Sequence, residues 1–337
     1  SGKFENLNIV VPLEDRSDRQ ILFQSNITDI EIDSVGGSPA MAGLNGYVEA
    51  SFDETSSTAV GFAEVDSQGF SINLPNIFSN TWGYDHVNGR LNFRLDLSVG
   101  QKLDLASSII FVESKAIDGR VIFSLKDHRE EGGDRDAEIE LAVSASRADA
   151  ASKHLYLPDG PNIKQNVRST MNYLNEAVLQ GDITRGGILY RGSTLPDAAS
   201  YEKTFQSYFV LSDTDFRFSD EWPVVTKMSG TVITDDNDID IKVDSGSSLG
   251  VGIQDVIGKI EKDGLGNAFL QLRGDLNAET SIGLHYLQET PVNDEFIGAV
   301  SNWEARGDFH GTLDLNVPLD STNSAAEIRL DLSLENN

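Results

Sequence analysis

The sequence predicts a mainly β protein, built as a long antiparallel sheet of repeated units with one helix. Three observations predict this fold class. Most apolar segments alternate with polar residues at a period of two, these segments end at Gly, Asn, Asp or Ser, and one strand pattern occurs twice along the chain. Alternation of this kind is typical of half-buried antiparallel strands joined by short turns. We therefore expect more than about a dozen strands.

Six segments show the strand pattern most clearly, and turn-forming residues bound most of them. They are residues 46–52, 70–74, 120–125, 205–211, 312–317 and 327–334. Short polar runs at 130–136, 235–238 and 321–324 predict hairpin turns. We interpret these runs as strand reversals and not as linkers between independent domains.

The repeated pattern covers residues 87–158 and 228–291. Each copy follows a tryptophan, Trp82 or Trp222, with Gly89 or Gly230 a few residues further on, and each closes on a proline. Stacked strand units favour a function carried by an extended surface over a catalytic centre. The predicted organisation is a first repeat region at 1–158, a helix insertion at 159–181, and a second repeat region at 182–337 that continues the first.

An amphipathic helix is predicted near residues 163–180. Pro161 stands just ahead of it and Gly181 just after it, as is typical of helix ends. Apolar residues recur along it at helical spacing, at Ile163, Val167, Met171, Leu174 and Val178. We expect this helix to cap an open end of the sheet, and a mobile gate or a partner-docking helix is the alternative.

Composition excludes several classes of protein. The 337 residues include 54 acidic and 26 basic ones, a formal charge of −28, which disfavours nucleic acid and anionic lipid headgroups as partners. Cysteine is absent, so disulfides, thiolate zinc sites and cysteine nucleophiles are excluded. No apolar run reaches the roughly 20 residues that cross a bilayer, and we expect no signal peptide within these residues. The start Ser1-Gly2-Lys3 resembles a cleavage scar, so we expect any membrane anchor to lie outside this segment.

Motifs of catalysis or metal binding are not found. The acidic run from Asp236 to Asp240 resembles a calcium loop, but Ile241 and Ser247 stand where that loop needs glycine and glutamate. Neither Gly-x-Gly pair, at 250–252 and 264–266, has the third glycine of a dinucleotide loop. The histidines are scattered without metal-ligand spacing, at His86, His128, His154, His285 and His310. We predict no cofactor, no metal and no enzymatic activity.

The alternating strands predict a sheet with one apolar and one polar face. One helix cannot cover a long apolar face, so the sheet either packs as a closed sandwich or curls into a trough. The stacked repeats favour the trough. A trough suits an acyl chain, because each methylene kept from water contributes ~0.8 kcal/mol, or about 12 kcal/mol for roughly 16 carbons. The side chains expected to line this lipid groove are Leu91, Phe93, Leu95, Leu97, Val121, Phe123, Leu125, Ile139, Leu141, Val143, Ile239, Ile241, Val243, Leu270, Leu272, Leu313, Leu315 and Val317.

A series of turn and strand residues then occurs in a characteristic order between about 155 and 319. The elements are Leu155–Pro158, Tyr173-Leu174 and Ala177 before Gly181–Ile183, Gly187–Gly192, Phe205–Val210, Phe216, Trp222-Pro223, Gly230, Gly246, Gly250, Gln254–Val256, Leu270–Gly274 and Thr290-Pro291. In this order they resemble the YhdP-type members of the AsmA-like family of bacterial envelope proteins. Each element alone is weak evidence for this resemblance, but the order in which the elements occur is specific.

The resemblance implies an inner-membrane-anchored protein whose periplasmic body is a folded-over β-sheet, or β-taco, with a hydrophobic groove. It implies transport of phospholipid between the inner and outer membranes and a part in outer membrane biogenesis, without catalytic residues. We therefore predict a non-enzymatic periplasmic lipid-transport segment with phospholipid as its partner. An elongated β-repeat scaffold or adhesin that binds a protein partner is the alternative. A carbohydrate-active enzyme is the third hypothesis. It needs aromatic platforms in an open acidic cleft, but Trp82, Trp222 and Trp303 are spaced like repeat markers instead.

Overall fold

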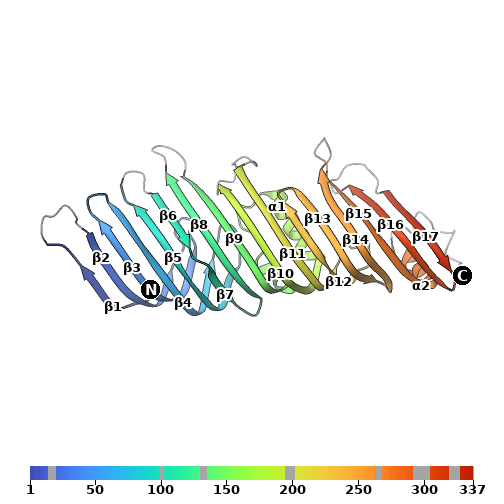
Figure 1. Cartoon of the computed structure of the whole chain (residues 1–337), viewed down its shortest axis with the longest axis horizontal. Helices are drawn as coiled ribbons and strands as arrows, with labels where there is room; N and C mark the ends of the chain where they lie inside the picture. The colour runs from blue at the N-terminus through green and yellow to red at the C-terminus, as the bar shows by residue number, and fades with distance from the viewer. Residues whose placement is uncertain are drawn as a thin grey trace. The chain divides into compact units, whose positions relative to one another are not determined.

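The computed structural model describes residues 1–13, 20–98, 102–129, 135–193, 202–262, 268–290, 304–318 and 327–336. Within them the protein is mainly β, as predicted, and its 17 strands pair antiparallel in one sheet (Figure 1). The chain divides into two compact units. Unit 1 comprises residues 1–148, 152–171 and 187–205, and unit 2 comprises 149–151, 172–186 and 206–337.

Unit 1 is a series of strands in which each pairs with the next along the chain. The strands are β1 (Lys3–Val10), β2 (Gln20–Ile32), β3 (Ala40–Asp53), β4 (Thr58–Asn73), β5 (Thr81–Asp96), β6 (Lys102–Ser107), β7 (Ile110–Glu113), β8 (Ile117–Arg129) and β9 (Arg135–Asp149). One position in the series is shared: β6 and β7 both pair with β5 on one side and with β8 on the other. The two short strands together therefore occupy the place of one long strand.

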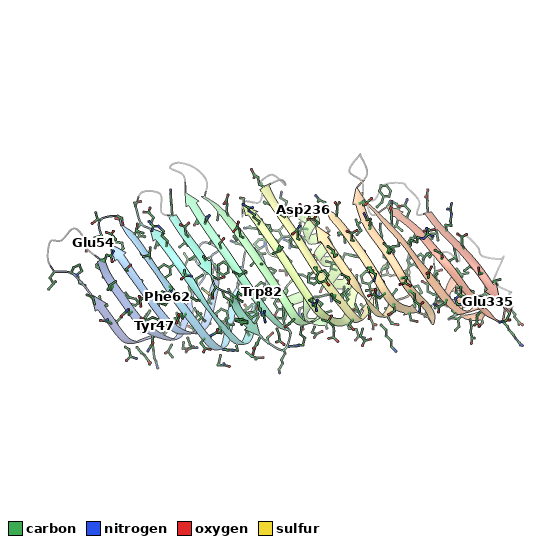
Figure 2. All side chains as sticks on the ribbon, in the orientation of Figure 1. Tyr47, Glu54, Phe62, Trp82, Asp236 and Glu335 are labelled. Carbon is green, nitrogen blue, oxygen red and sulfur yellow. The ribbon has the colours of Figure 1, made fainter. Side chains whose placement is uncertain are left out.

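In unit 2, too, each strand pairs antiparallel with the next along the chain. Its strands are β11 (Lys203–Phe216), β12 (Val225–Asp235), β13 (Asp238–Ser248), β14 (Val251–Lys262), β15 (Ala268–Glu279), β16 (Asp308–Pro318) and β17 (Glu327–Glu335). The strand β10 (Val178–Ser193) has residues in both units, and so do β11, whose first residues lie in unit 1, and β9, whose last residue lies in unit 2. The predicted turn at 235–238 joins β12 to β13, with Asp236 at φ 51° (Figure 2). Residues 130–134 and 321–324 of the other predicted turns lie outside the described residues.

The predicted helix is present but ends earlier than its pattern suggests. α1 spans Gln165–Ala177, and Val178 already begins β10. Gly181 does not end the helix. It lies within β10 at φ 140°, where a Cβ atom would stand 2.4 Å from Oγ1 of Thr214. Glycine is needed at that position because the backbone is both left-handed and close to its neighbour.

A short 3₁₀ helix and a second α-helix are not predicted by the sequence pattern. The 3₁₀ helix spans Ala150–Leu155, and α2 spans Thr280–Gln288 and packs against β14, β15 and β16. The apolar residues Ile282, Leu284 and Tyr286 of α2 alternate with other residues, which is the pattern of a strand and not of a helix. Within α2, Gly283 lies against the ring of Phe309, where a Cβ atom would stand 2.5 Å from Cε1.

The best-buried apolar cluster of unit 1 joins β3, β4, β5 and β7. Leu44, Phe70, Val87 and Val112 are each at most 9% exposed. The ring of Tyr84 stacks on that of Phe70 with 6.4 Å between centroids, and burial raises the pKa of the Tyr84 hydroxyl. The cluster is a closed core within unit 1, and further apolar side chains, among them Ile30 and Ile72, pack against it.

Residues 152–163, which we call the clasp, cross the β4–β5 connection of unit 1. Trp82 on β5 donates from Nε1 to the carbonyl oxygen of Leu155 at 2.7 Å and packs against Tyr156 with 5.4 Å between ring centroids. The backbone amides of Asp159 and Gly160 donate to the carbonyl of Ile77 at 3.1 and 2.8 Å. Trp82 therefore anchors the clasp and does not form an exposed platform.

A carboxylate completes the clasp. Asp159 accepts hydrogen bonds from the backbone amide of Ser79 at 2.7 Å and from the Ser79 hydroxyl. Arg168 of α1 donates to the carbonyl oxygens of Asp159 and Gly160 at 2.6 and 2.7 Å. The hydrogen bonds from Ser79 hold the pKa of the Asp159 carboxyl below its ordinary value.

The lowered pKa of Asp159 predicts a pH-dependent contribution to stability. Its stabilising effect is present above the unfolded pKa of aspartate, about 3.9, and is lost as pH falls through the lower folded pKa. We expect Asp159→Asn to lower the urea midpoint at pH 7 slightly and to flatten its decline below pH 4, measured by tryptophan fluorescence. Asp33→Asn, at an exposed carboxylate of unit 1, is the control. If the urea midpoint of Asp159→Asn declines below pH 4 as steeply as that of the unmodified chain, Asp159 does not make this contribution.

Candidate functional site

The strand registers of unit 1 bring apolar side chains from β5 to β9 onto one face. Directly opposite residues of antiparallel strands share a face. Phe93 of β5 lies opposite Leu105 of β6, Leu105 opposite Leu125 of β8, and Leu125 opposite Ile139 of β9. Parallel rows run beside this one, and most of their side chains are half-buried. We call this set the unit 1 apolar face: Leu91, Phe93, Leu95, Leu103, Leu105, Ile110, Val121, Phe123, Leu125, Ile139, Leu141 and Val143.

Unit 2 carries a second face of the same kind. One row begins with Val232 of β12, opposite Ile241 of β13, and continues from Leu272 of β15 to Leu315 of β16 and Ile328 of β17. Between β13 and β15 the row passes Gly258 of β14. The unit 2 apolar face comprises Phe209, Val232, Ile239, Ile241, Val243, Val256, Ile260, Leu270, Leu272, Leu313, Leu315, Val317, Ile328 and Leu330.

Glycines within these rows let large side chains lie flat on the sheet. A Cβ atom on Gly61 would stand 2.7 Å from Cζ of Phe93, and one on Gly258 would stand 2.4 Å from Cδ2 of Leu272. Each ring or isobutyl group therefore occupies the space above its neighbouring glycine. A larger residue in place of Gly61 would displace the ring of Phe93, and one in place of Gly258 would displace the side chain of Leu272.

The opposite face of each unit is polar and carries cross-strand ion pairs. In unit 1 the guanidinium of Arg90 lies 3.6 Å from the ring centroid of Phe62 and 3.3 Å from Glu64. Phe62 in turn lies beside Tyr47 of the neighbouring strand, with 6.0 Å between centroids (Figure 2). In unit 2 Arg273 lies 3.7 Å from Asp314 on the next strand. Such exposed pairs contribute little stability each, and their main effect is to keep this face in water.

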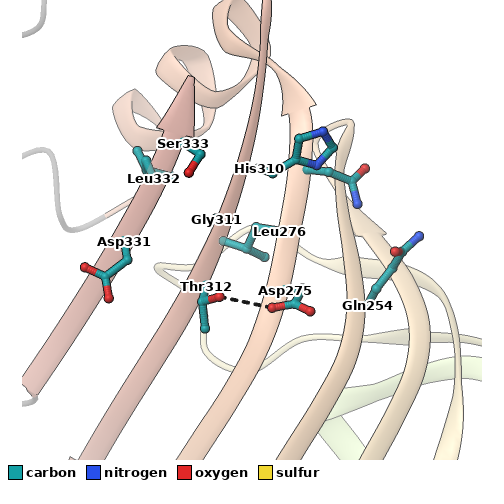
Figure 3. A pocket seen from close by; sticks show the side chains of 10 residues that line it. Gln254, Asp275, Leu276, His310, Gly311, Thr312, Asp331, Leu332 and Ser333 are labelled. Carbon is teal, nitrogen blue, oxygen red and sulfur yellow. Dashed lines mark hydrogen bonds between the residues drawn. The ribbon is translucent and has the colours of Figure 1, made fainter. Parts of the chain in front are cut away.

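Open concavities lie among the described strands, and two of them are lined largely by polar groups. The first, about 490 Å³, spans β14 to β17 and is lined by Gln254, Asp275, His310 and Asp331 among others (Figure 3). Within it Thr312 and Asp275 are joined by a hydrogen bond of 3.1 Å. The second, about 530 Å³, lies in unit 1 around Tyr47, Glu64 and Arg90. The polar lining suits water or small hydrophilic molecules and not hydrocarbon.

All the groove residues named from the sequence, except Leu97, lie in strands and on one of the two apolar faces. Leu97 follows the end of β5 and is 46% exposed. Val243 and Leu270, in contrast, are the most buried of the set, at 8% and 5% exposed. The sequence pattern therefore identifies the face of each strand but not how deeply each side chain is packed.

Sequence reasoning missed several members of the two faces. Leu103 and Leu105 of β6, Phe209 of β11, and Ile260 of β14 share the rows of predicted residues. The alternation of Leu103-Asp-Leu105 is a strand signal that could have identified β6. With only six residues in the strand, that signal is short. Polar residues also belong to the unit 1 rows: Asp127, 5% exposed, lies opposite Leu103 and Ala137, and Ser107 lies opposite Leu91.

The geometry offers no metal centre in the part of the chain that is described. No group of three His, Cys, Asp or Glu side chains gathers there in a way that could hold a metal ion. Of the acidic run from Asp236 to Asp240, Asp236 lies in the turn between β12 and β13, Asp238 begins β13, and Asp240 lies on the polar face near Lys259. His86 lies 2.7 Å from Asp66 on an exposed surface. Trp303 lies outside the described residues.

Helices long and apolar enough to span a bilayer do not occur among the described residues. In comparisons with known proteins, the model of a family described as YhdP protein matches residues 1–337. No curated protein and no solved structure matches the chain.

Proposed function

We propose, because this chain belongs to the YhdP family, that its two apolar faces bind phospholipid acyl chains as part of a non-enzymatic lipid-transport system. The family is one of bacterial envelope proteins. The proposal places this segment in the periplasm, anchored to the inner membrane by a part of the protein outside it. Phospholipid then passes between the inner and outer membranes along a hydrophobic groove to which the apolar faces contribute.

One observation carries the proposal: in each unit the strand registers align apolar side chains in rows across consecutive strands, with few interruptions such as Gly258 and Asp127. Neighbouring strands are about 4.8 Å apart, so a row across five strands extends about 19 Å. Each methylene that lies on such a row gains ~0.8 kcal/mol relative to water. An acyl chain is therefore held along its length by many equivalent contacts.

Equivalent contacts favour movement as well as binding. A lipid that shifts by one strand exchanges one row of Leu, Ile, Val and Phe side chains for another, so no single position holds it tightly. The polar faces, with ion pairs such as Glu64–Arg90, stay in water throughout. The formal charge of −28 opposes any attraction of anionic headgroups, so acyl-chain burial supplies the affinity.

Native mass spectrometry of the purified protein tests the proposal. We expect phospholipid to co-purify, and we expect Leu141→Arg to reduce it strongly because the guanidinium lies on the unit 1 apolar face, opposite Phe123. Ala142→Arg is the matched control, because Ala142 lies on the other face, opposite Ile122.

Protein that carries no phospholipid, or equal lipid loss in Leu141→Arg and Ala142→Arg, contradicts the proposal. Those results favour the alternative function, a β-repeat scaffold that binds a protein partner and is indifferent to charge on the apolar faces.

A further inference from the structure

The polar concavity of unit 1, about 530 Å³, lies on the face opposite to the unit 1 apolar face. One row of directly opposite residues crosses it: Asn26 of β2, Tyr47 of β3, Glu64 of β4 and Arg90 of β5. Directly opposite residues of antiparallel strands share a face, so these four side chains lie side by side.

The concavity lies where the pairing of the sheet is irregular. The register of β3 and β4 shifts between Ala42 and Gly46, and β6 and β7 leave Ser108 and Ile109 between them. Ser108, which lines the concavity, bonds to the backbone of Arg90: its amide donates to the carbonyl oxygen at 2.7 Å, and its hydroxyl accepts from the amide at 3.0 Å. Irregularities that re-aim side chains are common beside functional sites of β-sheets.

Arg90 is held in the concavity as a rigid hydrogen-bond donor. Its guanidinium lies 3.6 Å from the ring centroid of Phe62, Nη1 donates to Glu64 at 3.3 Å, and Nε donates to Asn92 at 3.2 Å. Among the described residues these hydrogen bonds involve Nε and Nη1 and not Nη2, which can donate to a ligand. A guanidinium already fixed by a ring and two hydrogen bonds loses little side-chain entropy when a ligand binds.

The lining of the concavity combines charged groups of both signs with neutral ones. Glu64 and Asp66 are acidic, Arg90 is basic, and Asn26 and Asn88 carry amides. The carboxylates outnumber the guanidinium, so repulsion disfavours anions such as phosphate. Donors and acceptors lie next to one another, which suits a neutral ligand with many hydroxyl groups, since each hydroxyl both donates and accepts.

We propose that the polar concavity of unit 1 binds a neutral saccharide, with Arg90, Glu64 and Asn88 hydrogen-bonded to its hydroxyl groups. A sugar ring has hydroxyl groups around its edge and C–H groups on its faces, and the aromatic ring of Tyr47 packs against those C–H groups. The volume of the concavity lies in the range of small-molecule sites, about 300–1,000 Å³. The inference goes beyond the proposed function and holds whether or not the apolar faces bind lipid.

Saturation-transfer NMR and calorimetric titration test the site with neutral di- and trisaccharides of glucose, galactose and N-acetylglucosamine. At least one of these saccharides is expected to bind. Arg90→Ala is expected to raise its Kd about tenfold or more, because a charge-assisted hydrogen bond is lost. Asn88→Ala, at an exposed side chain of the same concavity, is expected to raise the Kd as well and leaves the contact between Arg90 and Glu64 in place.

Arg94→Ala is the matched control, because Arg94 is an exposed arginine on the same face of β5 but does not line the concavity. It is expected to leave the saccharide Kd unchanged, and Arg90→Ala is expected to leave the amount of co-purified phospholipid unchanged. Circular dichroism checks that each variant is folded, and Asn88→Ala decides the outcome if Arg90→Ala is not.

Three results would each overturn the proposal. The first is a chain that binds none of these saccharides, and the second is a chain that binds inorganic phosphate more tightly than any of them. The third is a saccharide Kd that stays unchanged in the folded Arg90→Ala and Asn88→Ala variants, or that rises equally in Arg94→Ala.

Discussion

Ile241→Glu is expected to abolish phospholipid binding by the unit 2 apolar face while the sheet stays folded. Ile241 is half-buried and lies opposite Val232 on one side and Gly258 on the other. Because Gly258 has no side chain, a carboxylate at 241 has no polar neighbour in the row. An acyl chain that covers this carboxylate removes it from water, at a cost of about 3 kcal/mol or more, which weakens binding more than about a hundredfold.

Lys242→Glu provides the matched control, because Lys242 is the next residue of β13 and lies on the polar face beside Asp244. It changes the net charge further than Ile241→Glu does but leaves the apolar row intact. Binding is measured by titration with a fluorescent phospholipid, and folding by circular dichroism. If Ile241→Glu retains the affinity of the unmodified chain, or if Lys242→Glu loses it equally, then the apolar row is not the binding surface.

Phe70→Ala is expected to destabilise unit 1 by about 3–5 kcal/mol. Phe70 is 8% exposed within the closed cluster of unit 1 and stacks on Tyr84, so truncation leaves a cavity that its neighbours fill only in part. Urea unfolding followed by circular dichroism measures the change in the free energy of unfolding.

Phe111→Ala makes the same truncation at a side chain of unit 1 that is 44% exposed. It is expected to cost less than about 1 kcal/mol. Equal losses in the two variants would show that the closed cluster does not hold unit 1 together.

Strand identity and the direction of side chains were predictable from the sequence because both follow from the period of two. Leu91, Phe93 and Leu95 alternate with Asn92 and Arg94, so they had to share a face. The registers then align this face with its neighbours. The strand pattern also predicted segments 120–125 and 312–317, which lie in β8 and β16.

Features that depend on contacts distant in sequence were not predictable. Residues 280–288 alternate like a strand but form α2, where Gly283 packs on Phe309. The division of one strand position between β6 and β7 depends on pairing with both β5 and β8. The clasp joins Trp82 to Leu155, more than 70 residues apart, through a side chain whose hydrogen bond no local pattern encodes.

The central claim is that acyl chains contact the apolar faces, and site-specific photo-crosslinking tests it most directly. A benzophenone amino acid replaces Phe123 on the unit 1 apolar face or its neighbour Ile122, which points to the opposite face and is 45% exposed. After irradiation in cells, phospholipid attached to the protein is identified by mass spectrometry. The account predicts lipid adducts at position 123 and none at 122, whereas equal labelling at both positions, or labelling at 122 alone, would contradict it.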